Sequence, residues 1–440
     1  MSFGSTIFAL ASAPGRAGVA VFRISGPEAQ KVFSLLGRDY SAPHPREATL
    51  RKLHHPQTGE VIDHALLLWF PGPDSFTGED VVELHTHGGR AITTALTDIL
   101  RTLPGFRMAE PGEFARRAFE NGKLDLTEAE AIADLVDAET EAQRRQAMRQ
   151  YEGALGALYE GWCERLKQSL AYLEAAIDFA DEDLPQDLAD RQTAALRELI
   201  NEIVAHLNDQ HRGERLREGF SIAILGPPNA GKSSLLNVLA QRDAAIVSAT
   251  AGTTRDVIEV HLDLGGYPVT LADTAGLRET AGEIESEGIR RALARAEKAD
   301  LKLLVFDGAH WPCRDEATQR LADDRAIQVV NKADVISSRD AGYLFLSAKT
   351  GEGIPALLEK MMHEIDLRFA ATGAPPLTRP RHRAALEESV GHLRRSFAAA
   401  EAELRAEDTR LALRALGRIT GHVGVEDLLD VIFRDFCIGK

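Results

Sequence analysis

The chain has 440 residues, 44% of them hydrophobic, and a formal net charge of −16 at pH 7. A chain of this length predicts about three domains at ~150 residues each, with enough apolar side chains to bury several cores. The negative charge argues against broad, non-specific binding to a nucleic-acid backbone, but not against a local contact or one made through a partner. No apolar run reaches the ~18 residues that span a membrane, so we expect a cytoplasmic protein without membrane contact.

The first part of the chain, residues 1–118, is predicted to form an α+β domain. Strand-like apolar runs occur at residues 19–24 and 65–70, and turns rich in Pro and Gly separate them. This pattern is typical of a compact domain in which strands and helices are mixed.

Long helices are predicted on both sides of a central segment. Apolar residues recur at helical spacing, within a charged background, from residue 126 to about 182 and again at 194–206 and 383–417. A domain whose two chain ends lie near each other can be inserted into another domain. We therefore expect one discontinuous helical domain around the central segment, with two independent helical domains as the alternative.

The central segment opens with a phosphate-binding loop. Residues 226–233 fit the pattern GxxxxGK[ST], after an apolar run at 222–225 and before a helix-forming run at 234–240. Glycines let backbone N–H groups approach phosphate oxygens, Lys232 neutralises the outer phosphates, and the Ser233 hydroxyl serves a magnesium ion. The segment predicts a nucleoside triphosphate site.

Two further motifs follow at the spacing of a guanine-nucleotide-binding (G) domain. Residues 252–256 read GTTRD, a switch that offers a second hydroxyl to magnesium. Residues 273–276 read DTAG, the DxxG motif that senses the terminal phosphate. Leu277 stands where Ras-like enzymes place the glutamine that orients the attacking water, so another group must handle that water.

Several groups are candidates for orienting the water and for stabilising the transition-state charge. The carboxylates just downstream are Glu279, Glu283, Glu285 and Glu287. The pattern alone does not choose among them. Arg255 and Arg278 are near enough to be considered as arginine fingers, although solvated surface charges explain them as well. A monovalent cation held by Asn229 and by oxygens of residues 248–253 is the alternative.

The base is read by a later motif. Residues 331–334, NKAD, follow an apolar strand at 327–330 and match the guanine-reading NKxD motif. The Asp334 carboxylate can accept two hydrogen bonds from guanine, whereas adenine offers neither donor there, and an unpaired buried carboxylate costs several kcal/mol. Residues 347–349, SAK, match the loop that packs on the base, after a strand at 343–346. The order of these motifs predicts a G domain.

The predicted fold class is therefore a multidomain α/β plus α protein. An α+β domain at 1–118 precedes a discontinuous helical domain at 119–215 and 375–440. Between the two helical parts, residues 216–374 form an inserted Ras-like P-loop G domain with a mostly parallel sheet and flanking helices.

Two remaining features have less specific interpretations. The three cysteines, Cys163, Cys313 and Cys437, are widely spaced, which indicates neither a disulfide framework nor a metal cluster. A basic run at 378–383 is a candidate local RNA contact, although solvated charges at the start of a helix explain it as well.

Over essentially its whole length the chain resembles the bacterial tRNA modification GTPase family MnmE, also called TrmE. The G motifs recur in many families, but the short sequence motifs outside the G domain do not. These motifs are APGRAGV at 13–19, RISG at 23–26, FTGED at 76–80, PGEF at 111–114, NGKLDL at 121–126 and CIGK at 437–440. One departure is HT at 85–86, where the family commonly has Gln followed by a small residue or Cys.

The resemblance implies a GTP-hydrolysing protein that works with an FAD-containing, MnmG-like partner in a hetero-oligomer. Together they install an aminomethyl-type (carboxymethylaminomethyl) group at C5 of the wobble uridine of certain tRNAs. The carbon comes from a tetrahydrofolate derivative in its 5-formyl or 5,10-methylene form. Homodimerisation through the N-terminal domain and potassium-dependent pairing of G domains are implied as well. The folate contacts carried over by resemblance are Arg23, Glu83, Lys123 and Lys440.

The resemblance also assigns the nucleotide site. Glu285 aligns with the catalytic glutamate, Ser233 and Thr254 with the magnesium ligands, and Cys437 is a candidate functional thiol. The potassium positions are Asn229, Ser248, Thr250 and Thr253. The implied GTP-binding residues are Asn229, Ala230, Gly231, Lys232, Ser233, Ser234, Ser248, Thr250, Thr253, Thr254, Asp273, Thr274, Ala275, Gly276, Asn331, Lys332, Asp334, Ser347, Ala348 and Lys349.

Two other classes of protein would share the G motifs. A ribosome-assembly GTPase that acts as an RNA-binding checkpoint predicts a basic RNA-binding appendage, against which the acidic net charge and the terminal CIGK argue. A scaffold with an inert nucleotide site would leave the magnesium and phosphate ligands without a role.

Overall fold

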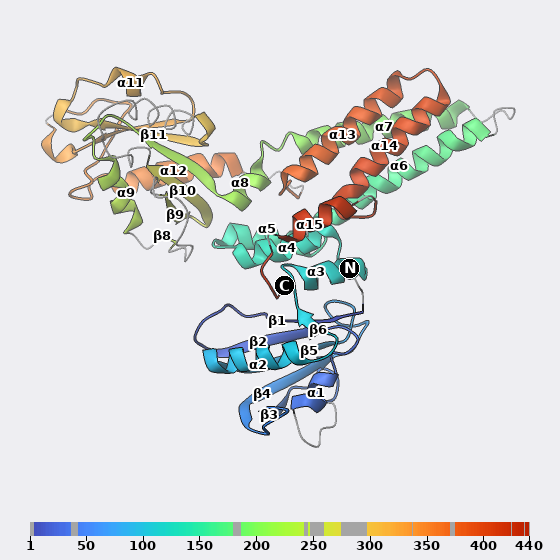
Figure 1. Ribbon diagram of the computed structural model, residues 1–440. Helices are drawn as coiled ribbons and strands as arrows, with labels where there is room; N and C mark the ends of the chain where they lie inside the picture. The colour runs from blue at the N-terminus through green and yellow to red at the C-terminus, as the bar shows by residue number, and fades with distance from the viewer. Residues whose placement is uncertain are drawn as a thin grey trace, which may run out of the picture. The chain divides into compact units, whose positions relative to one another are not determined.

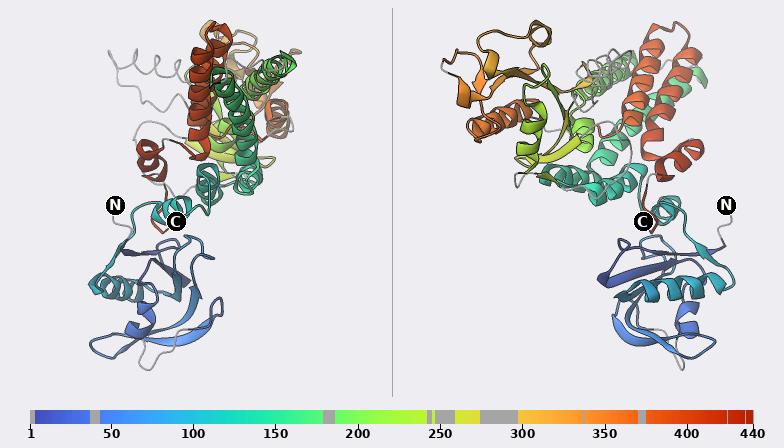
Figure 2. Two further views of the ribbon diagram at one scale, coloured as in Figure 1. Left: turned by 90° about the vertical axis from the view of Figure 1, so that its right-hand side faces the viewer. Right: turned by 60° about the vertical axis from the view of Figure 1, so that its left-hand side comes forward.

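The computed structural model describes residues 4–36, 43–178, 186–241, 245–246, 259–273, 297–336, 338–369, 375–423, 425–434 and 436–439. The chain divides into two compact units, and each is described by itself (Figure 1, Figure 2). Unit 1 contains residues 1–133, 150–199 and 385–440, and unit 2 contains residues 134–149 and 200–384.

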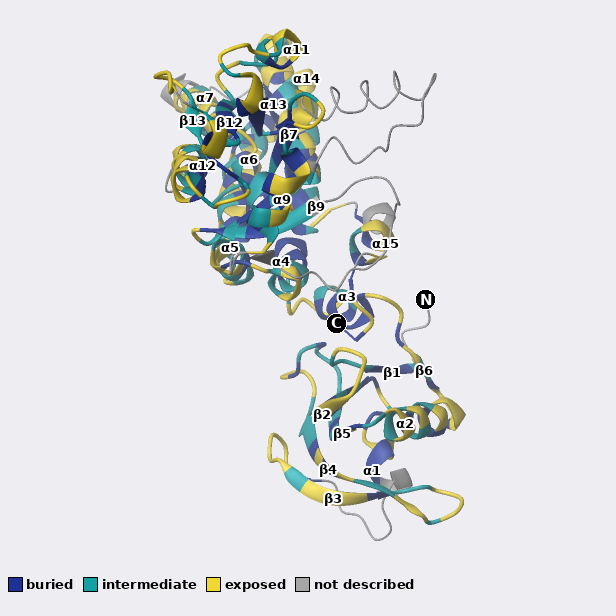
Figure 3. Ribbon diagram, turned by 90° about the vertical axis from the view of Figure 1, so that its left-hand side faces the viewer, coloured by how far each residue is buried: buried dark blue, intermediate teal, exposed yellow. Residues whose placement is uncertain are grey.

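Unit 1 begins with a six-stranded sheet of strand order β3-β4-β5-β2-β1-β6. The strands are β1 (Thr6–Leu10), β2 (Ala17–Ser25), β3 (Thr49–His54), β4 (Val61–Phe70), β5 (Val81–Gly88) and β6 (Phe106–Met108). Neighbouring strands are antiparallel except β1 and β6, which are parallel. Two helices, α1 (Lys31–Leu36) and α2 (Arg90–Thr102), lie against one side of the sheet (Figure 3).

Side-chain alternation gives this sheet two different faces. On β2, Phe22 and Ile24 are buried in the core that α1 and α2 cover, while Arg23 between them is half-buried on the opposite face. On β5, Val82 and Leu84 alternate in the same way with the half-buried Glu83. The face that carries Arg23 and Glu83 is therefore the one that α1 and α2 leave uncovered.

Helices make up the rest of unit 1. A short helix, α3 (Glu113–Glu120), follows the sheet and leads into α4 (Leu126–Asp137). The remaining helices are α6 (Ala154–Asp178), α7 (Gln186–Leu207), α13 (Pro380–Ala398), α14 (Ala402–Thr420) and α15 (Glu426–Arg434). Residues 134–137 of α4, 200–207 of α7 and 380–384 of α13 are grouped with unit 2. Helices α6 and α14 lie side by side (Figure 1), and Arg410 Nη2 of α14 donates to Glu174 Oε1 of α6 at 2.8 Å. Helices thus occupy most of the described residues of the three stretches in which helical spacing predicted them.

Unit 2 is built on a seven-stranded sheet of order β13-β12-β11-β7-β10-β9-β8. The strands are β7 (Phe220–Leu225), β8 (Ala245–Ile246), β9 (Glu259–Leu264), β10 (Tyr267–Asp273), β11 (Leu301–Asp307), β12 (Ala326–Asn331) and β13 (Leu344–Phe345). Strands β10, β7, β11, β12 and β13 run parallel, while β9 is antiparallel to both of its neighbours. The mostly parallel sheet agrees with the prediction for the central segment, although the strand expected at 343–346 is shorter.

The helices of unit 2 pack around this sheet. They are α5 (Glu141–Tyr151), α8 (Arg212–Glu218), α9 (Lys232–Ala240), α11 (Glu316–Gln319) and α12 (Ile354–Phe369), with the 3₁₀ turns η1 (Gly308–His310) and η2 (Ala333–Val335). The central strands β7 and β11 have almost continuous buried runs, as expected of parallel strands covered on both faces. Their carboxyl ends lead into the loops that carry the sequence motifs. In neither unit does a described helix have the length and apolar character needed to cross a membrane.

Candidate functional site

The phosphate-binding loop follows β7 and requires glycine at two positions. Gly226 has φ of 154°, and a Cβ there would lie 2.2 Å from the Val305 carbonyl oxygen of the neighbouring β11. Gly231 has φ of 85°, and a Cβ there would lie 2.3 Å from Asn331 Nδ2. Both contacts are far too short for a side chain, so the loop can adopt this path only with glycine. The next residue begins α9, whose N-terminus favours bound anions.

Lys232 is the buried cation of this loop. Its Nζ donates to the Gly226 and Pro227 carbonyl oxygens, each at 2.8 Å. Those bonds hold the ammonium over the turn on which the outer phosphates are expected. Asn229, at the tip of the loop, is exposed and has φ of 63°, so its amide oxygen is accessible to a ligand.

Asn331 joins the phosphate-binding loop to the base-binding loops. It is buried at the end of β12, and its Nδ2 donates to the Ala230 carbonyl oxygen at 2.8 Å. Its Oδ1 accepts the Ala348 backbone N–H at 3.0 Å. A single side chain therefore links three of the predicted motifs, GxxxxGK[ST], NKxD and SAK.

Asp334 and Ser347, from the two base-binding motifs, are direct partners. The Ser347 hydroxyl donates to Asp334 Oδ1 at 2.6 Å. This hydrogen bond, together with the charges of Lys349 and Lys332, lowers the pKa of Asp334 from its ordinary 3.8. The carboxylate thus stays ionised at neutral pH, as an acceptor for guanine N–H groups must.

Asp307 belongs to the site although sequence reasoning missed it. It ends β11, beside Asn331 in the parallel register, and its Oδ2 accepts from Lys332 Nζ at 2.7 Å. Burial would raise the pKa of Asp307, but the hydrogen bonds from Lys332 and the Ala309 N–H, with the nearby positive charges, together outweigh it, so the pKa is lowered. The signal in the sequence was an aspartate directly after an apolar strand, in the same position as the start of NKxD.

Most of the predicted switch region lies outside the described residues. Asp273 ends β10 next to β7, opposite Ile224 in the register, so the DxxG motif starts beside the phosphate-binding loop. The other predicted residues of this region lie outside the described residues; they are Ser248, Thr250, Thr253, Thr254, Thr274, Ala275, Gly276 and Glu285, with the alternatives Arg255, Arg278, Glu279, Glu283 and Glu287. The magnesium and potassium sites and the catalytic glutamate therefore stay predictions.

A second candidate site lies on the face of the N-terminal sheet that α1 and α2 do not cover. Arg23 and Glu83 are opposite each other on β2 and β5, with Arg23 Nε 3.0 Å from Glu83 Oε1. Glu83 Oε2 lies 3.0 Å from Nε2 of His85, the residue at which the chain departs from the family pattern. The neighbouring His87 is paired instead with Asp63 at 2.8 Å. The structure thus brings together two of the four predicted folate contacts.

The other two folate contacts are placed only in part. Lys123 is exposed, and its Cγ lies 3.4 Å from where a Cβ on Gly78 would be. Lys440 lies outside the described residues, although Gly439 before it packs on Leu10 and Ala11 at the end of β1.

The three cysteines differ in environment. Cys163 is buried in α6, and burial raises the pKa of its thiol to about 11, which makes it unreactive. Cys313 and Cys437 are exposed, and the Cys437 carbonyl accepts the Gly112 N–H at 3.4 Å. A functional role for the Cys437 thiol stays a prediction. Within the described ranges, no group of three or more His, Cys, Asp or Glu side chains could hold a metal ion.

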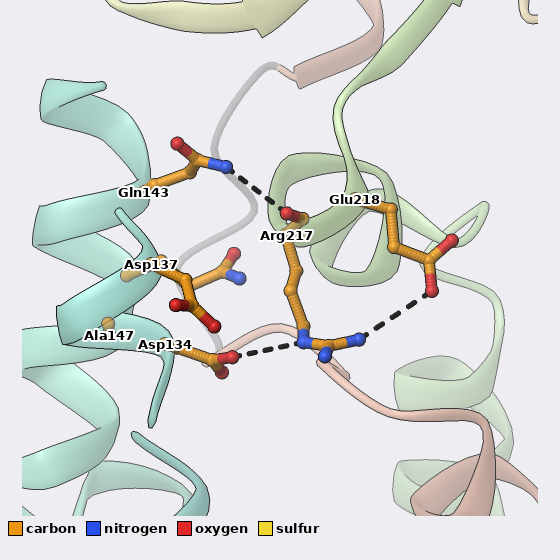
Figure 4. A pocket seen from close by; sticks show the side chains of 7 residues that line it. Asp134, Asp137, Gln143, Ala147, Arg217 and Glu218 are labelled. Atoms are coloured by element: carbon orange, nitrogen blue, oxygen red, sulfur yellow. Dashed lines mark hydrogen bonds and ion pairs between the residues drawn. The ribbon is translucent and has the colours of Figure 1, made fainter. Parts of the chain in front are cut away.

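Unit 2 also contains a polar cavity of about 150 Å³ between α5 with the end of α4 on one side and α8 on the other (Figure 4). Asp134 Oδ1 accepts from Arg217 Nε at 3.0 Å and from Arg379 Nη2 at 2.8 Å. Arg217 lies just before β7 and Arg379 just before α13, so one carboxylate binds the chain where it enters the sheet and where it enters α13, after α12. Arg383 is likewise paired, with Asp209 at 2.6 Å. These ion pairs favour the helix-start interpretation of the basic run at 378–383.

The nucleotide site and its sheet define the class of the protein: it is a P-loop GTPase. Comparison with known proteins gives the family. The family model described as GTP-binding protein TrmE N-terminus matches residues 6–123, and the one described as MnmE helical domain matches residues 126–437. The chain belongs to the MnmE family of tRNA modification GTPases.

Individual relatives match over nearly the whole chain. The tRNA modification GTPase MnmE of Paramagnetospirillum magneticum is 58% identical over 441 residues, which cover 99% of each chain. The 5-taurinomethyluridine-[tRNA] synthase subunit GTPB3, mitochondrial, of Homo sapiens is 47% identical over 463 residues, which cover 99% of this chain and 94% of that protein. Among solved structures, the G domain of the T. maritima FeoB iron transporter is 27% identical, with a TM-score of 0.26, and covers 33% of this chain and 98% of that domain.

Proposed function

We propose that this GTPase supports modification of the wobble uridine of certain tRNAs, together with an FAD-containing, MnmG-like partner. One observation carries the proposal: Asn331 joins the phosphate-binding loop to the loops of the guanine-reading motifs, in a chain that matches a tRNA modification GTPase over 99% of its length. The modification is an aminomethyl-type group at C5, and GTP hydrolysis drives a conformational step that accompanies it.

The described residues have separate tasks in nucleotide binding. Lys232 and the N-terminus of α9 bind the outer phosphates, with the Ser233 hydroxyl on magnesium. Asp334 accepts the guanine N–H groups, and Ser347 fixes the carboxylate for that purpose. Asn331 fixes the position of the phosphate-binding loop relative to the base-binding loop. The γ-phosphate of a bound GTP would therefore have one position relative to the switch residues.

Hydrolysis is assigned to residues of the switch. Glu285 orients the attacking water, and the Thr254 hydroxyl would serve as the second magnesium ligand. Potassium, when bound, offsets the charge that builds between the β- and γ-phosphates, a term worth roughly 10³ or more in rate. The exposed amide of Asn229 on the left-handed turn of the loop fits one oxygen ligand of such a cation. Pairing of two G domains is the activating event.

The N-terminal sheet is assigned to a tetrahydrofolate derivative in its 5-formyl or 5,10-methylene form. A folate carries a guanine-like pterin, suited to a carboxylate, and glutamate carboxylates, suited to a cation. Arg23 and Glu83 offer both groups side by side on a face that α1 and α2 leave uncovered, which supports this assignment. Lys123 and Lys440 complete the proposed set. Homodimerisation through this domain, tRNA contact mainly through the partner and a cytoplasmic location belong to the same proposal.

The experiment that tests the GTPase mechanism compares GTP turnover in potassium and in sodium at equal ionic strength, over a range of protein concentrations. A large potassium-specific acceleration that grows with protein concentration is expected. Equal slow rates in both salts would reject the cation mechanism and return Arg255, Arg278 or an external activator to consideration. The modification itself is tested by mass spectrometry of wobble nucleosides after incubation with tRNA, the flavin partner, GTP, the folate derivative and an amine donor (ammonium or glycine), with omission of this chain as the control.

A further inference from the structure

The loop of residues 75–80 (the 75–80 loop) contains the sequence motif FTGED. Its polar side chains form hydrogen bonds with neighbouring residues. The buried Thr77 hydroxyl lies 2.7 Å from the Ser25 hydroxyl, which donates to Glu79 Oε2 at 2.8 Å. Asp80 Oδ1 accepts the Gly72 N–H at 2.9 Å. These bonds hold the loop to β2 and to Gly72, which precedes it in the chain. The loop therefore has little conformational entropy to lose when a ligand binds.

A chain of buried ion pairs anchors the same loop to α3. Arg117 Nη1 donates to Glu79 Oε2 at 2.9 Å, and Arg117 Nη2 donates to Glu113 Oε1 at 3.0 Å. Arg107, beyond Glu113, donates to the second oxygen of that carboxylate at 2.7 Å. Arg117 and Glu113 are both buried, so these charges are screened little by solvent.

The first consequence concerns Arg23. Its guanidinium carbon lies 5.3 Å from the centre of the Phe76 ring and 5.9 Å from that of Phe114. Both rings are close enough for attraction between the cation and their π faces. With Glu83 holding Nε and Nη2 at 3.0 Å, the guanidinium has one preferred plane. Phe76 is the member of this set that the 75–80 loop supplies.

The second consequence concerns Lys123. Asn121 Nδ2 donates to the Thr77 carbonyl oxygen at 2.7 Å, which binds the turn after α3 to the 75–80 loop. Gly78, with φ of 77°, lets this turn approach, since a Cβ there would lie 2.9 Å from Asn121 Cβ. Lys123 is two residues further on, and its backbone N–H is fixed by the Ala118 carbonyl at 2.8 Å. One loop therefore places both described cations of the proposed folate site.

We propose that Phe76 and Asn121 are positioning residues of the N-terminal ligand site, with Phe76 orienting Arg23 and Asn121 placing Lys123. This inference rests on the proposed folate function. Neither residue is among the predicted folate contacts: Phe76 acts through Arg23, beside which its ring lies, and Asn121 acts through the turn that carries Lys123. Phe76→Leu keeps an apolar side chain of similar size but removes the ring, and Asn121→Ala removes an exposed amide and its hydrogen bond.

The test is calorimetric titration of the full chain with 5-formyltetrahydrofolate, with thermal unfolding of each variant as the check on folding. We expect Phe76→Leu and Asn121→Ala each to weaken binding by roughly 3–10-fold. Phe76→Tyr, which keeps the ring, should bind as the unchanged chain does. The matched control is Phe70→Leu, which removes a ring that lies 6.0 Å from the Arg46 guanidinium carbon, away from the proposed contacts.

Double-mutant cycles separate positioning from a general structural effect. In an Arg23→Ala background, Phe76→Leu should weaken binding no further, and in a Lys123→Ala background the same should hold for Asn121→Ala. Undiminished effects in those backgrounds, or unchanged binding in both single variants, would overturn the inference while the folate function stands. If the unchanged chain does not bind 5-formyltetrahydrofolate, the folate function fails and the inference fails with it.

Discussion

Replacement of Asn331 by alanine would remove both hydrogen bonds that join the nucleotide loops. The Ala230 carbonyl and the Ala348 N–H would each lose a partner at a site where Asn331 is only 2% exposed. An unsatisfied buried backbone group costs about 1–3 kcal/mol, so we expect a loss of about 3 kcal/mol in the free energy of unfolding of unit 2. For a domain of 150–250 residues that corresponds to a fall of about 6–12 °C in Tm.

Thermal unfolding of the full chain measures this loss. The unfolding transition whose midpoint temperature rises with saturating GDP is the one of the nucleotide-binding unit. Because neither bond of Asn331 depends on the γ-phosphate, GTP and GDP affinities should fall by the same factor, measured by displacement of a fluorescent GDP. The control is Gln328→Ala on the same strand, since Gln328 Oε1 is buried without a hydrogen-bond partner among the described residues. A Tm within about 2 °C of the unchanged chain would refute the reasoning.

Three further outcomes are expected. Asp334→Asn should lower GTP affinity by roughly 10³-fold or more and favour xanthosine triphosphate, whose 2-oxo group accepts from the new amide; unchanged GTP binding in a competition assay contradicts this. Glu285→Ala should leave GTP binding nearly intact and abolish most hydrolysis, with Glu283→Ala as control, and unaltered turnover would remove Glu285 from the role. Burial would raise the pKa of Glu113, but the hydrogen bonds from Arg107 and from the Glu110 N–H, with the charges of Arg107 and Arg117, together outweigh it and lower the pKa below 4.5. The stability that this carboxylate contributes is therefore present above its unfolded pKa and lost as pH falls through the folded value. Glu113→Gln should flatten the fall in Tm between about pH 6 and pH 3, and an unchanged profile would contradict the sign.

Local sequence predicted the parts of the nucleotide site that depend on local geometry. The strand before the phosphate-binding loop and the strand before NKxD are present as β7 and β12, because an apolar run followed by a fixed motif has few other conformations. Asp307 was not predicted, because its link to Lys332 depends on the parallel register of β11 and β12, which no local pattern reveals.

The N-terminal site shows the same limit. The family resemblance predicted Arg23 and Glu83 as site residues, and the structure places them in contact. The sequence motifs around Glu79, Glu113 and Arg117 did not indicate that these three residues form ion pairs with one another. Those residues meet only because α3 returns to the loop between β4 and β5. The predicted boundaries at 118, 215 and 374 stay predictions; in the structure, residues 134–149 and 200–215 group with the nucleotide-binding sheet.

The ion pairs of Asp134 determine which residues a separately expressed nucleotide-binding fragment must include. A fragment cut at 216 and 374 would lack both Asp134 and Arg379, and Arg217 would keep its charge without the carboxylate that binds it. The Gly266 carbonyl, which accepts the Ala142 N–H at 3.0 Å, would also be left to solvent. A fragment meant to fold by itself should therefore include residues 134–149, which form the end of α4 and most of α5, and a shorter fragment should be less stable than the same sheet within its own chain.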